Sequence, residues 1–211
     1  MNRYAPTDTT NSFYQGARFL TAASQLDQAP PDQGSEVAFI GRSNAGKSSA
    51  INAICHQGSL ARTSKTPGRT QQLIFFALDA ERRLVDLPGY GYARVAIDIK
   101  AEWQGLMSHY LERRRALTGL VILMDCRHPL TVFDRELLAW GDRRGLPRLL
   151  LLTKADKLRR GPAAAVRSEV QKGVRDHAGP IQVELFSAHA RVGIGPVQAW
   201  LDERLGVPRA G

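Results

Sequence analysis

The sequence contains few of the residues that build disulfide frameworks and structural metal sites. Only two of its 211 residues are cysteines, Cys55 and Cys126, which lie far apart and form no Cys-x-x-Cys pair. The five histidines show no metal-ligand spacing. These absences argue against a disulfide-stapled scaffold or a zinc domain, and they suggest a reduced interior.

Long apolar runs are absent as well. The first six residues, MNRYAP, lack the apolar centre of a signal sequence, and the longest apolar runs are far too short to span a bilayer. We therefore expect a cytoplasmic protein that has no membrane partner. We also expect a monomer with one globular domain, large enough for a substantial core.

Acidic residues are scarce relative to basic ones, with 20 Asp and Glu against 29 Lys and Arg, so the formal net charge is +9. Arginine clusters occur at Arg82-Arg83, Arg113-Arg114-Arg115, Arg143-Arg144 and Arg159-Arg160. A solvated basic surface is one interpretation of this charge. The other is an anionic partner such as RNA, because a bound nucleotide alone does not need charge spread so widely.

One segment carries a specific chemical pattern. An apolar run at 37–40 leads into Gly-x-x-x-x-Gly-Lys-Ser, and a helix-like segment follows. Glycines let the backbone curl around a di- or triphosphate, so that N–H groups and the positive helix end face the anion. Lys47 would reach the outer phosphates and the Ser48 hydroxyl would bind Mg²⁺. An ordinary Gly-rich turn is the alternative to this phosphate-binding loop, which comprises Gly41, Arg42, Ser43, Asn44, Ala45, Gly46, Lys47 and Ser48.

From residue 36 onward, strand-like and helix-like segments alternate. Strands are expected at 36–40, 72–78, 83–86, 119–125, 148–153 and 181–187, and helices at 47–55, 96–116, 131–144, 162–177 and 194–205. Continuous apolar runs among these strands are typical of strands buried on both faces. The alternation predicts an α/β fold in three layers, with a mostly parallel six-stranded sheet and helices on both faces. We divide the chain into an extension and linker (1–34), a domain (35–205) and a tail (206–211).

The strand at 83–86 leads into Asp86-Leu87-Pro88-Gly89. Downstream of a phosphate-binding loop, an aspartate in this place can hold Mg²⁺ through water, and the glycine N–H can meet the terminal phosphate. Alone, Asp-x-x-Gly is a weak signal, because such mixtures are common turns. Its value comes from its position at a strand end.

Thr153-Lys154-Ala155-Asp156 ends the strand at 148–153. Asp156 can accept hydrogen bonds from the N1–H and 2-amino groups of guanine, which adenine lacks, at about 1.5–3 kcal/mol each. Lys154 would lay its aliphatic stem along the base. A surface Lys-Asp pair that caps a helix is the alternative. Farther along, a backbone N–H within 186–188 could meet the guanine carbonyl oxygen.

The polar stretch at 64–71 has no strong helical or strand period. A threonine in it can close onto Mg²⁺ when the terminal phosphate is present and release the ion afterwards. Thr66 and Thr70 are both candidates on chemistry alone.

Four strings together resemble the EngB (YihA, YsxC) bacterial GTPases, which belong to the Era and TrmE-like branch. They are GRSNAGKSS at 41–49, TPGRTQ at 66–71, DLPGYGYA at 86–93 and TKADK at 153–157. The third is the most family-specific, and the resemblance covers about residues 35–205. It implies a Ras-like fold, binding of GTP or GDP with Mg²⁺, and a role in assembly of the large ribosomal subunit, with a cell-division (septation) link in some members.

The resemblance also implies roles for individual residues. Thr70 becomes the switch threonine and a Mg²⁺ ligand together with Ser48, while Asp86 acts on the ion through water. Lys47, Thr70 and Gly89 take the catalytic contacts. The positions implied at the phosphates beyond the loop are Gly68, Arg69, Thr70, Gln71, Gln72, Asp86, Leu87, Pro88 and Gly89, and those implied at guanine are Thr153, Lys154, Ala155, Asp156, Phe186, Ser187 and Ala188.

One common catalytic component is missing. Many GTPases place a glutamine directly after Asp-x-x-Gly to orient the attacking water, and this chain has Tyr90 there. We therefore expect slow hydrolysis without a partner or a monovalent cation. In related GTPases an asparagine at the position of Asn44 helps to hold K⁺ beside the phosphates, although it could instead stabilise the loop by its own hydrogen bonds. Arg69 and Arg94 are candidates for an internal arginine finger.

Three functions compete at this point. The first is a nucleotide-controlled switch that binds the large ribosomal subunit or its RNA, or else another RNA or protein partner. The second is a P-loop kinase or ATPase, and the third is a mechanochemical or membrane GTPase. The guanine pattern argues against the second, and the lack of stalk or membrane segments argues against the third.

Overall fold

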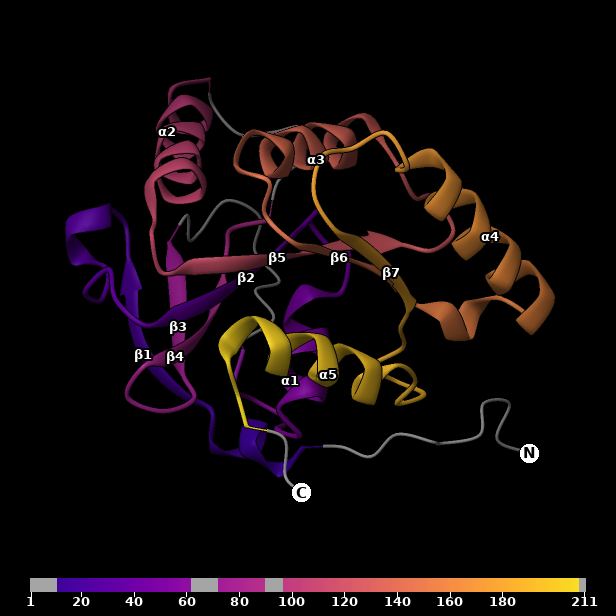
Figure 1. Ribbon diagram of the computed structural model, residues 1–211, viewed down its shortest axis with the longest axis horizontal. Coiled ribbons are helices and arrows are strands. Elements are labelled where there is room, and N and C mark those ends of the chain that lie inside the picture. The colour runs from indigo at the N-terminus through magenta and orange to yellow at the C-terminus, as the bar shows by residue number, and fades with distance from the viewer. Residues whose placement is uncertain (1–10, 62–71, 90–96, 209–211) are drawn as a thin grey trace.

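The computed structural model describes residues 11–61, 72–89 and 97–208. At its centre is one seven-stranded sheet with the strand order β1-β3-β4-β2-β5-β6-β7 (Figure 1). The strands are Arg18–Ala23 (β1), Ser35–Gly41 (β2), Leu73–Ala77 (β3), Arg82–Asp86 (β4), Leu117–Asp125 (β5), Arg148–Thr153 (β6) and Ile181–Leu185 (β7). Strands β4, β2, β5, β6 and β7 are parallel, whereas β3 pairs antiparallel with both β1 and β4. The prediction of a mostly parallel sheet is confirmed.

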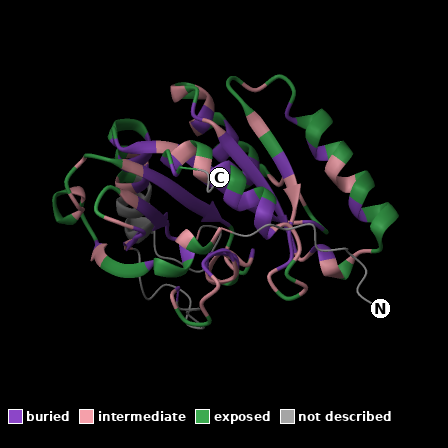
Figure 2. Ribbon diagram, turned by 60° about the horizontal axis from the view of Figure 1, so that its bottom comes forward, coloured by how far each residue is buried: buried purple, intermediate pink, exposed green. Residues whose placement is uncertain are grey.

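Helices cover both faces of this sheet. They are Lys47–Ile54 (α1), Ile97–Arg113 (α2), Val132–Arg144 (α3), Arg160–Gly173 (α4) and Ile194–Leu205 (α5). Helices α1 and α5 share one hydrophobic cluster with the sheet, and α2, α3 and α4 share another on the opposite face (Figure 1). The strands between them are mostly buried, and the outer sides of the helices are exposed (Figure 2). None of the described helices has the length and apolar composition needed to cross a membrane.

Local sequence explains several helix boundaries. Thr131 and Asp134 form a reciprocal capping box at the start of α3, and Gly145 ends that helix in a left-handed conformation with φ 59°. Helix α4 begins two residues earlier than predicted, so that Pro162 falls in the first turn, where its missing N–H is not needed. The same helix ends at Gly173 rather than at 177, because the backbone of Val174 has already left the helical conformation.

The sheet has one strand more than the six predicted. The additional strand is β1, which lies in the segment 1–34 and forms one edge of the sheet through its pairing with β3. Arg18, Phe19 and Leu20 are all exposed, and the pairing register shifts between Phe19 and Thr21. An edge strand with such an irregularity has no alternation of buried and exposed side chains, so the period-two signal is absent from the sequence.

The residues before β1 are anchored on α5. Tyr14 is fully buried, and its hydroxyl donates to Asp202 Oδ1 (2.7 Å). Asn11 N donates to Gln198 Oε1 (2.7 Å), and Gln198 Nε2 donates in turn to Ile54 O (2.7 Å) at the end of α1. The segment preceding β1 is thus joined to both helices on this face of the sheet.

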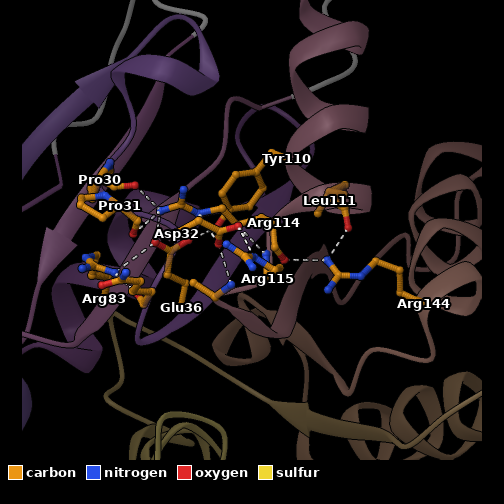
Figure 3. A network of polar contacts seen from close by, with 12 residues as sticks. Pro30, Pro31, Asp32, Glu36, Arg83, Tyr110, Leu111, Arg114, Arg115 and Arg144 are labelled. Atoms are coloured by element: carbon orange, nitrogen blue, oxygen red, sulfur yellow. Dashed lines mark hydrogen bonds and ion pairs between the residues drawn. The ribbon is translucent and has the colours of Figure 1, made fainter.

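A buried polar network lies at the amino ends of β2 and β4 (Figure 3). Glu36 is fully buried and accepts hydrogen bonds from Arg114 Nε (3.0 Å), Arg114 Nη2 (2.7 Å) and the Tyr110 hydroxyl (3.0 Å). Arg83 Nη1 also donates to Glu36 (3.4 Å), and Arg114 Nη2 donates to Pro30 O (2.8 Å). The network therefore ties the linker, the sheet and the end of α2 together.

Arg148 forms a second buried centre, at the amino end of β6. Its side chain is fully buried, and Nη1 donates to Leu138 O (2.7 Å) and Asp142 Oδ1 (2.6 Å), while Nη2 donates to Ala178 O. The other oxygen of Asp142 lies 2.7 Å from His177 Nδ1. Burial alone would raise the pKa of Asp142, but Arg148 and His177 outweigh burial and lower it.

Candidate functional site

The carboxyl ends of the parallel strands form one edge of the sheet, here called the carboxyl edge. Strands β4, β2, β5 and β6 are neighbours in that order and end at Asp86, Gly41, Asp125 and Thr153. Strand β2 leads to α1 on one face, whereas the next helix after β4 is α2 on the other face. Open α/β sheets bind ligands where successive connections leave in opposite directions, so this edge is the candidate site.

The loop between β2 and α1 is shaped by its backbone. Gly41 approaches β5 so closely that a Cβ would lie 2.8 Å from Leu123 O. Asn44 and Gly46 have positive φ angles of 63° and 92°, and these turn the chain into α1. Helix α1 therefore directs its first backbone N–H groups and the positive end of its dipole toward the carboxyl edge.

Lys47, the first residue of α1, forms an ion pair with Asp86 at the end of β4. Their side chains are only 13% and 12% exposed. A Cβ on Gly89 would lie 3.5 Å from Ser43 N, so the segment after β4 lies against the loop. The structure thus brings together the lysine, the aspartate and the glycine that the sequence assigns to the phosphates.

Thr153 connects the predicted guanine segment to the same loop. It is 3% exposed, and its hydroxyl lies in hydrogen-bond contact with Ala45 O (2.7 Å) and Met124 O (3.1 Å). Two residues later, Ala155 N donates to Phe186 O (3.0 Å). The segment 153–156 therefore contacts both the loop that precedes α1 and the chain that follows β7.

Asp156 is oriented by its neighbours. Ser187 Oγ donates to Asp156 Oδ1 (2.6 Å), and Lys157 Nζ lies 3.3 Å from Oδ2. Burial alone would raise the pKa of Asp156, but these contacts outweigh burial and lower it. The carboxylate is therefore ionised at neutral pH and can accept a pair of N–H groups.

The structure narrows the choice of backbone donor within 186–188. Phe186 N donates to Leu152 O (2.8 Å), and Ser187 N donates to Val192 O (3.1 Å). Within the described ranges, Ala188 N has no backbone partner. Of the three N–H groups that the sequence left open for the guanine carbonyl oxygen, that of Ala188 is the one not already used in the turn.

Lys154 contacts Asp125, which in turn is held by Arg127, and the sequence singled out neither residue. Its Nζ lies 2.9 Å from Asp125 Oδ2, and Arg127 donates to the same carboxylate through Nε (2.9 Å) and Nη2 (2.6 Å). The contact with Arg127 and, after it, that with Lys154 hold the pKa of Asp125 far below its usual range. The sequence nevertheless contains a signal for Asp125. Like Asp86, it is a carboxylate residue at the end of a buried strand.

Part of the predicted site lies outside the described residues, namely Thr66, Gly68, Arg69, Thr70, Gln71, Tyr90 and Arg94. Gln72 is described, and its Nε2 donates to Ser24 Oγ (2.9 Å) just after β1. Among residues 11–61, 72–89 and 97–208, no group of three or more His, Cys, Asp and Glu side chains is arranged to hold a metal ion.

Comparison with protein families gives a match to the model described as 50S ribosome-binding GTPase, over residues 36–154. A relative from Nitrosococcus oceani, described as probable GTP-binding protein EngB, is 53% identical over 197 residues, which cover 93% of this chain and 98% of the relative. A relative of the same description from Coxiella burnetii is 50% identical over 190 residues, with coverage of 90% and 93%. Another, from Stenotrophomonas maltophilia, is 50% identical and covers 88% of this chain and 95% of its own length.

Solved structures share the fold. A crystal structure of a probable GTP-binding protein engB has a TM-score of 0.65 at 19% identity and covers 82% of this chain and 100% of its own. A variant of Aquifex aeolicus Era bound to GDP and AlF₄⁻ has a TM-score of 0.63 at 16% identity and covers 85% of this chain and 58% of its own. At these identities the similarity concerns the architecture alone.

Proposed function

The chain belongs to the EngB family of GTP-binding proteins, and on this premise we propose that it acts as a nucleotide-controlled switch in assembly of the large ribosomal subunit. It is a P-loop GTPase, which binds GTP and hydrolyses it to GDP and phosphate. The observation that supports the proposed site best is the junction at Thr153, which joins the phosphate loop to the segment that carries Asp156. The ribosomal role is supported by the family description and by the basic charge. We propose further that the protein acts as a cytoplasmic monomer and that it has a link to cell division.

At the phosphates, Lys47 has to exchange partners. A triphosphate carries more negative charge than the carboxylate of Asp86, so we expect Lys47 Nζ to move from Asp86 to the outer phosphate oxygens. The backbone N–H groups of the loop would surround the inner phosphates at the same time. The carboxylate of Asp86 would then become available as an acceptor for water.

Mg²⁺ fits the oxygen donors at this edge, because it prefers hydroxyl, carboxylate, phosphate and water ligands in combination. Ser48 and Thr70 would hold the ion directly and Asp86 through water. When bound, the ion would neutralise negative charge on the phosphates.

Guanine selectivity follows from the orientation of Asp156. Ser187 fixes one oxygen of the carboxylate by a hydrogen bond, and the ionised group can accept N1–H and the 2-amino group of guanine. Adenine would not supply these two N–H donors to the partly buried carboxylate, which is strongly unfavourable. The Ala188 N–H would meet the guanine carbonyl oxygen, and Lys154 would cover one face of the base.

For hydrolysis, we assign the contacts with the transferred phosphate to Lys47, Thr70 and Gly89. The aromatic side chain of Tyr90 cannot orient water through a carboxamide, so the unaided reaction is expected to be slow. Asn44, exposed and in a left-handed conformation, is proposed to hold K⁺ beside the phosphates. Hydrolysis rates measured in matched K⁺ and Na⁺ buffers test this role, and equal rates would remove it.

The basic charge available to RNA is smaller than composition suggests. Arg83 and Arg114 are only 7% and 6% exposed, because Glu36 and backbone carbonyls bind them. The side chains of Arg115 and Arg143, by contrast, are 83% and 58% exposed. We propose that ribosomal RNA contacts exposed arginines such as these, since phosphate contacts need accessible cations.

Co-sedimentation with large ribosomal subunits tests the ribosomal role. We expect more protein in the pellet with a non-hydrolysable GTP analogue than with GDP, and less at higher salt, since counterion release drives such binding. A Lys47→Ala variant is the control, because it should respond to neither nucleotide. Association that ignores the nucleotide in the wild type would contradict the proposal and would favour a GTPase with another RNA or protein partner.

A further inference from the structure

We propose that Asp125 is a positioning residue for guanine recognition, which together with Arg127 fixes Lys154 before the nucleotide arrives. The inference rests on the proposed function, because Lys154 is the residue assigned there to the face of the base. Asp125 itself ends β5 and is not assigned a contact with the nucleotide.

The carboxylate of Asp125 uses both of its oxygens. Oδ1 accepts from Arg127 N (3.1 Å) and Arg127 Nε (2.9 Å), and Oδ2 accepts from Arg127 Nη2 (2.6 Å) and contacts Lys154 Nζ (2.9 Å). The three side chains are 46% (Arg127), 33% (Lys154) and 19% (Asp125) exposed. Asp125 is therefore the inner member, and Arg127 holds it from the solvent side while Lys154 extends from it.

The main chain of Lys154 is tied to the same strand end. Asp125 pairs with Thr153 in the register of β5 and β6, and Cys126 N donates to Thr153 O (3.0 Å). Cys126 Sγ lies 3.4 Å from Lys154 O, and the backbone of Lys154 is left-handed with φ 58°. Both ends of the lysine, its backbone and its Nζ, are thus fixed by residues 125 and 126.

This arrangement has a consequence for binding. A lysine stem has several rotatable bonds, and ordering it only when the base binds would subtract from the affinity. The Asp125 carboxylate also compensates the charge of Lys154. Without it, the ammonium group would be drawn toward Asp156, two residues away, and would compete with guanine for that carboxylate. Asp125 therefore contributes affinity for guanine nucleotides without touching them.

A double-mutant cycle separates this role from a purely structural one. Asp125→Asn should weaken GDP binding about three- to fivefold, mainly through faster dissociation, as expected for loss of a partly exposed ion pair. Lys154→Met keeps an apolar stem and removes the ammonium group. The double variant should bind GDP no more weakly than Lys154→Met alone. Asp125 is proposed to act through the ammonium group of Lys154, and that group is already absent from Lys154→Met.

Asp79→Asn is the matched control. Like Asp125, Asp79 accepts from backbone N–H groups and pairs with an arginine two or three residues later: Glu81 N (2.9 Å), Arg82 N (2.7 Å) and Arg82 Nη1 (2.6 Å) donate to it. It lies in the turn between β3 and β4, at the amino end of β4 and therefore away from the carboxyl edge. Its substitution should leave the dissociation rate of GDP unchanged.

The outcomes are distinct. Additive effects of Asp125→Asn and Lys154→Met, or wild-type GDP dissociation from Asp125→Asn, would overturn the inference. If Asp125→Asn does not fold, Arg127→Gln replaces it in the cycle, and its smaller effect must likewise vanish in the Lys154→Met background. If wild type and Asp79→Asn both fold and neither binds GDP, the proposed function itself fails, and the inference with it.

Discussion

The two edges of the central sheet use charged side chains in different ways. At the amino edge, where the parallel strands begin, Glu36 and Arg148 are fully buried, and their partners are residues of the fold itself. At the carboxyl edge, Lys47 and Lys154 are 13% and 33% exposed, and each contacts a single carboxylate among the described residues. One edge therefore holds charges in buried networks internal to the fold, and the other holds them in single ion pairs at the candidate nucleotide site.

The difference shows how a single sheet can separate stability from binding. A buried ion whose partner is removed stays uncompensated in a poorly polarisable interior, and the folded state loses that energy. A pair near the surface can be re-solvated, so its loss mainly changes what the pair was positioned to bind. Substitutions at the carboxyl edge should consequently change nucleotide affinity, and those at the amino edge should change the free energy of unfolding.

The largest effect is expected for Lys47→Ala. It removes the charged hydrogen bonds to the outer phosphates, and GDP and GTP affinity should fall about a thousandfold while the fold is retained. Isothermal titration and circular dichroism measure the two quantities. Lys172→Ala, at the exposed end of α4, is the control for loss of one positive charge. Unaltered GTP affinity in Lys47→Ala would contradict the phosphate-loop assignment.

Asp156→Asn comes next. An amide at this position donates where the carboxylate accepted, so GTP affinity should fall about a hundredfold and xanthosine triphosphate affinity should rise. Ser187 Oγ can still donate to the remaining carbonyl oxygen, so the loop should keep its shape. Competition between the two nucleotides gives the ratio directly, and an unchanged preference would rule out the assignment of Asp156 to guanine.

Glu36→Gln probes the opposite edge. Arg114 would keep Asp32 at 3.6 Å but lose its closer, fully buried charged partner, and the free energy of unfolding should fall by about 3 kcal/mol. Urea denaturation measures this change, with Glu136→Gln on the exposed side of α3 as the control. The folded fraction should bind GDP as tightly as the wild type. A large drop in affinity without loss of stability would break the comparison between the two edges.

The smallest effect is expected for Thr153→Val, which keeps the shape of the side chain and removes its hydroxyl. The carbonyl of Ala45 in the phosphate loop would lose a buried donor, at about 1 kcal/mol. GDP affinity should fall several-fold, with little change in the preference for guanine over xanthine. If the preference for guanine over xanthine fell by the same factor as the GDP affinity, Thr153 would act through Asp156 rather than through the loop.

The sequence was sufficient to predict most of the elements. Strand β6 and helix α5 have the predicted bounds, because a continuous apolar run and a clear helical stripe mark them. Strand β1 was missed, since its exposed apolar residues and its register shift give no periodic pattern. Its position depends on pairing with β3, about fifty residues away, and such long-range contacts are not encoded locally.

The candidate site was predictable to the extent that it consists of backbone patterns. The glycines of the loop and the residues that follow β4 and β6 are recognisable from spacing alone. The ion pairs Lys47–Asp86 and Lys154–Asp125 were not, because they join residues from different strands and helices. The arginine clusters were misleading in part, since burial of Arg83 and Arg114 depends on the distant Glu36.

The contact between Tyr14 and Asp202 has a consequence for how the protein is made. The two residues are separated by 188 positions, so the tyrosine leaves the ribosome long before its partner does. At a synthesis rate of about 5–20 residues per second, the delay is roughly 10–40 s. During that interval the tyrosine lacks the helix that buries it, and its packing against α5 is therefore among the last steps of folding.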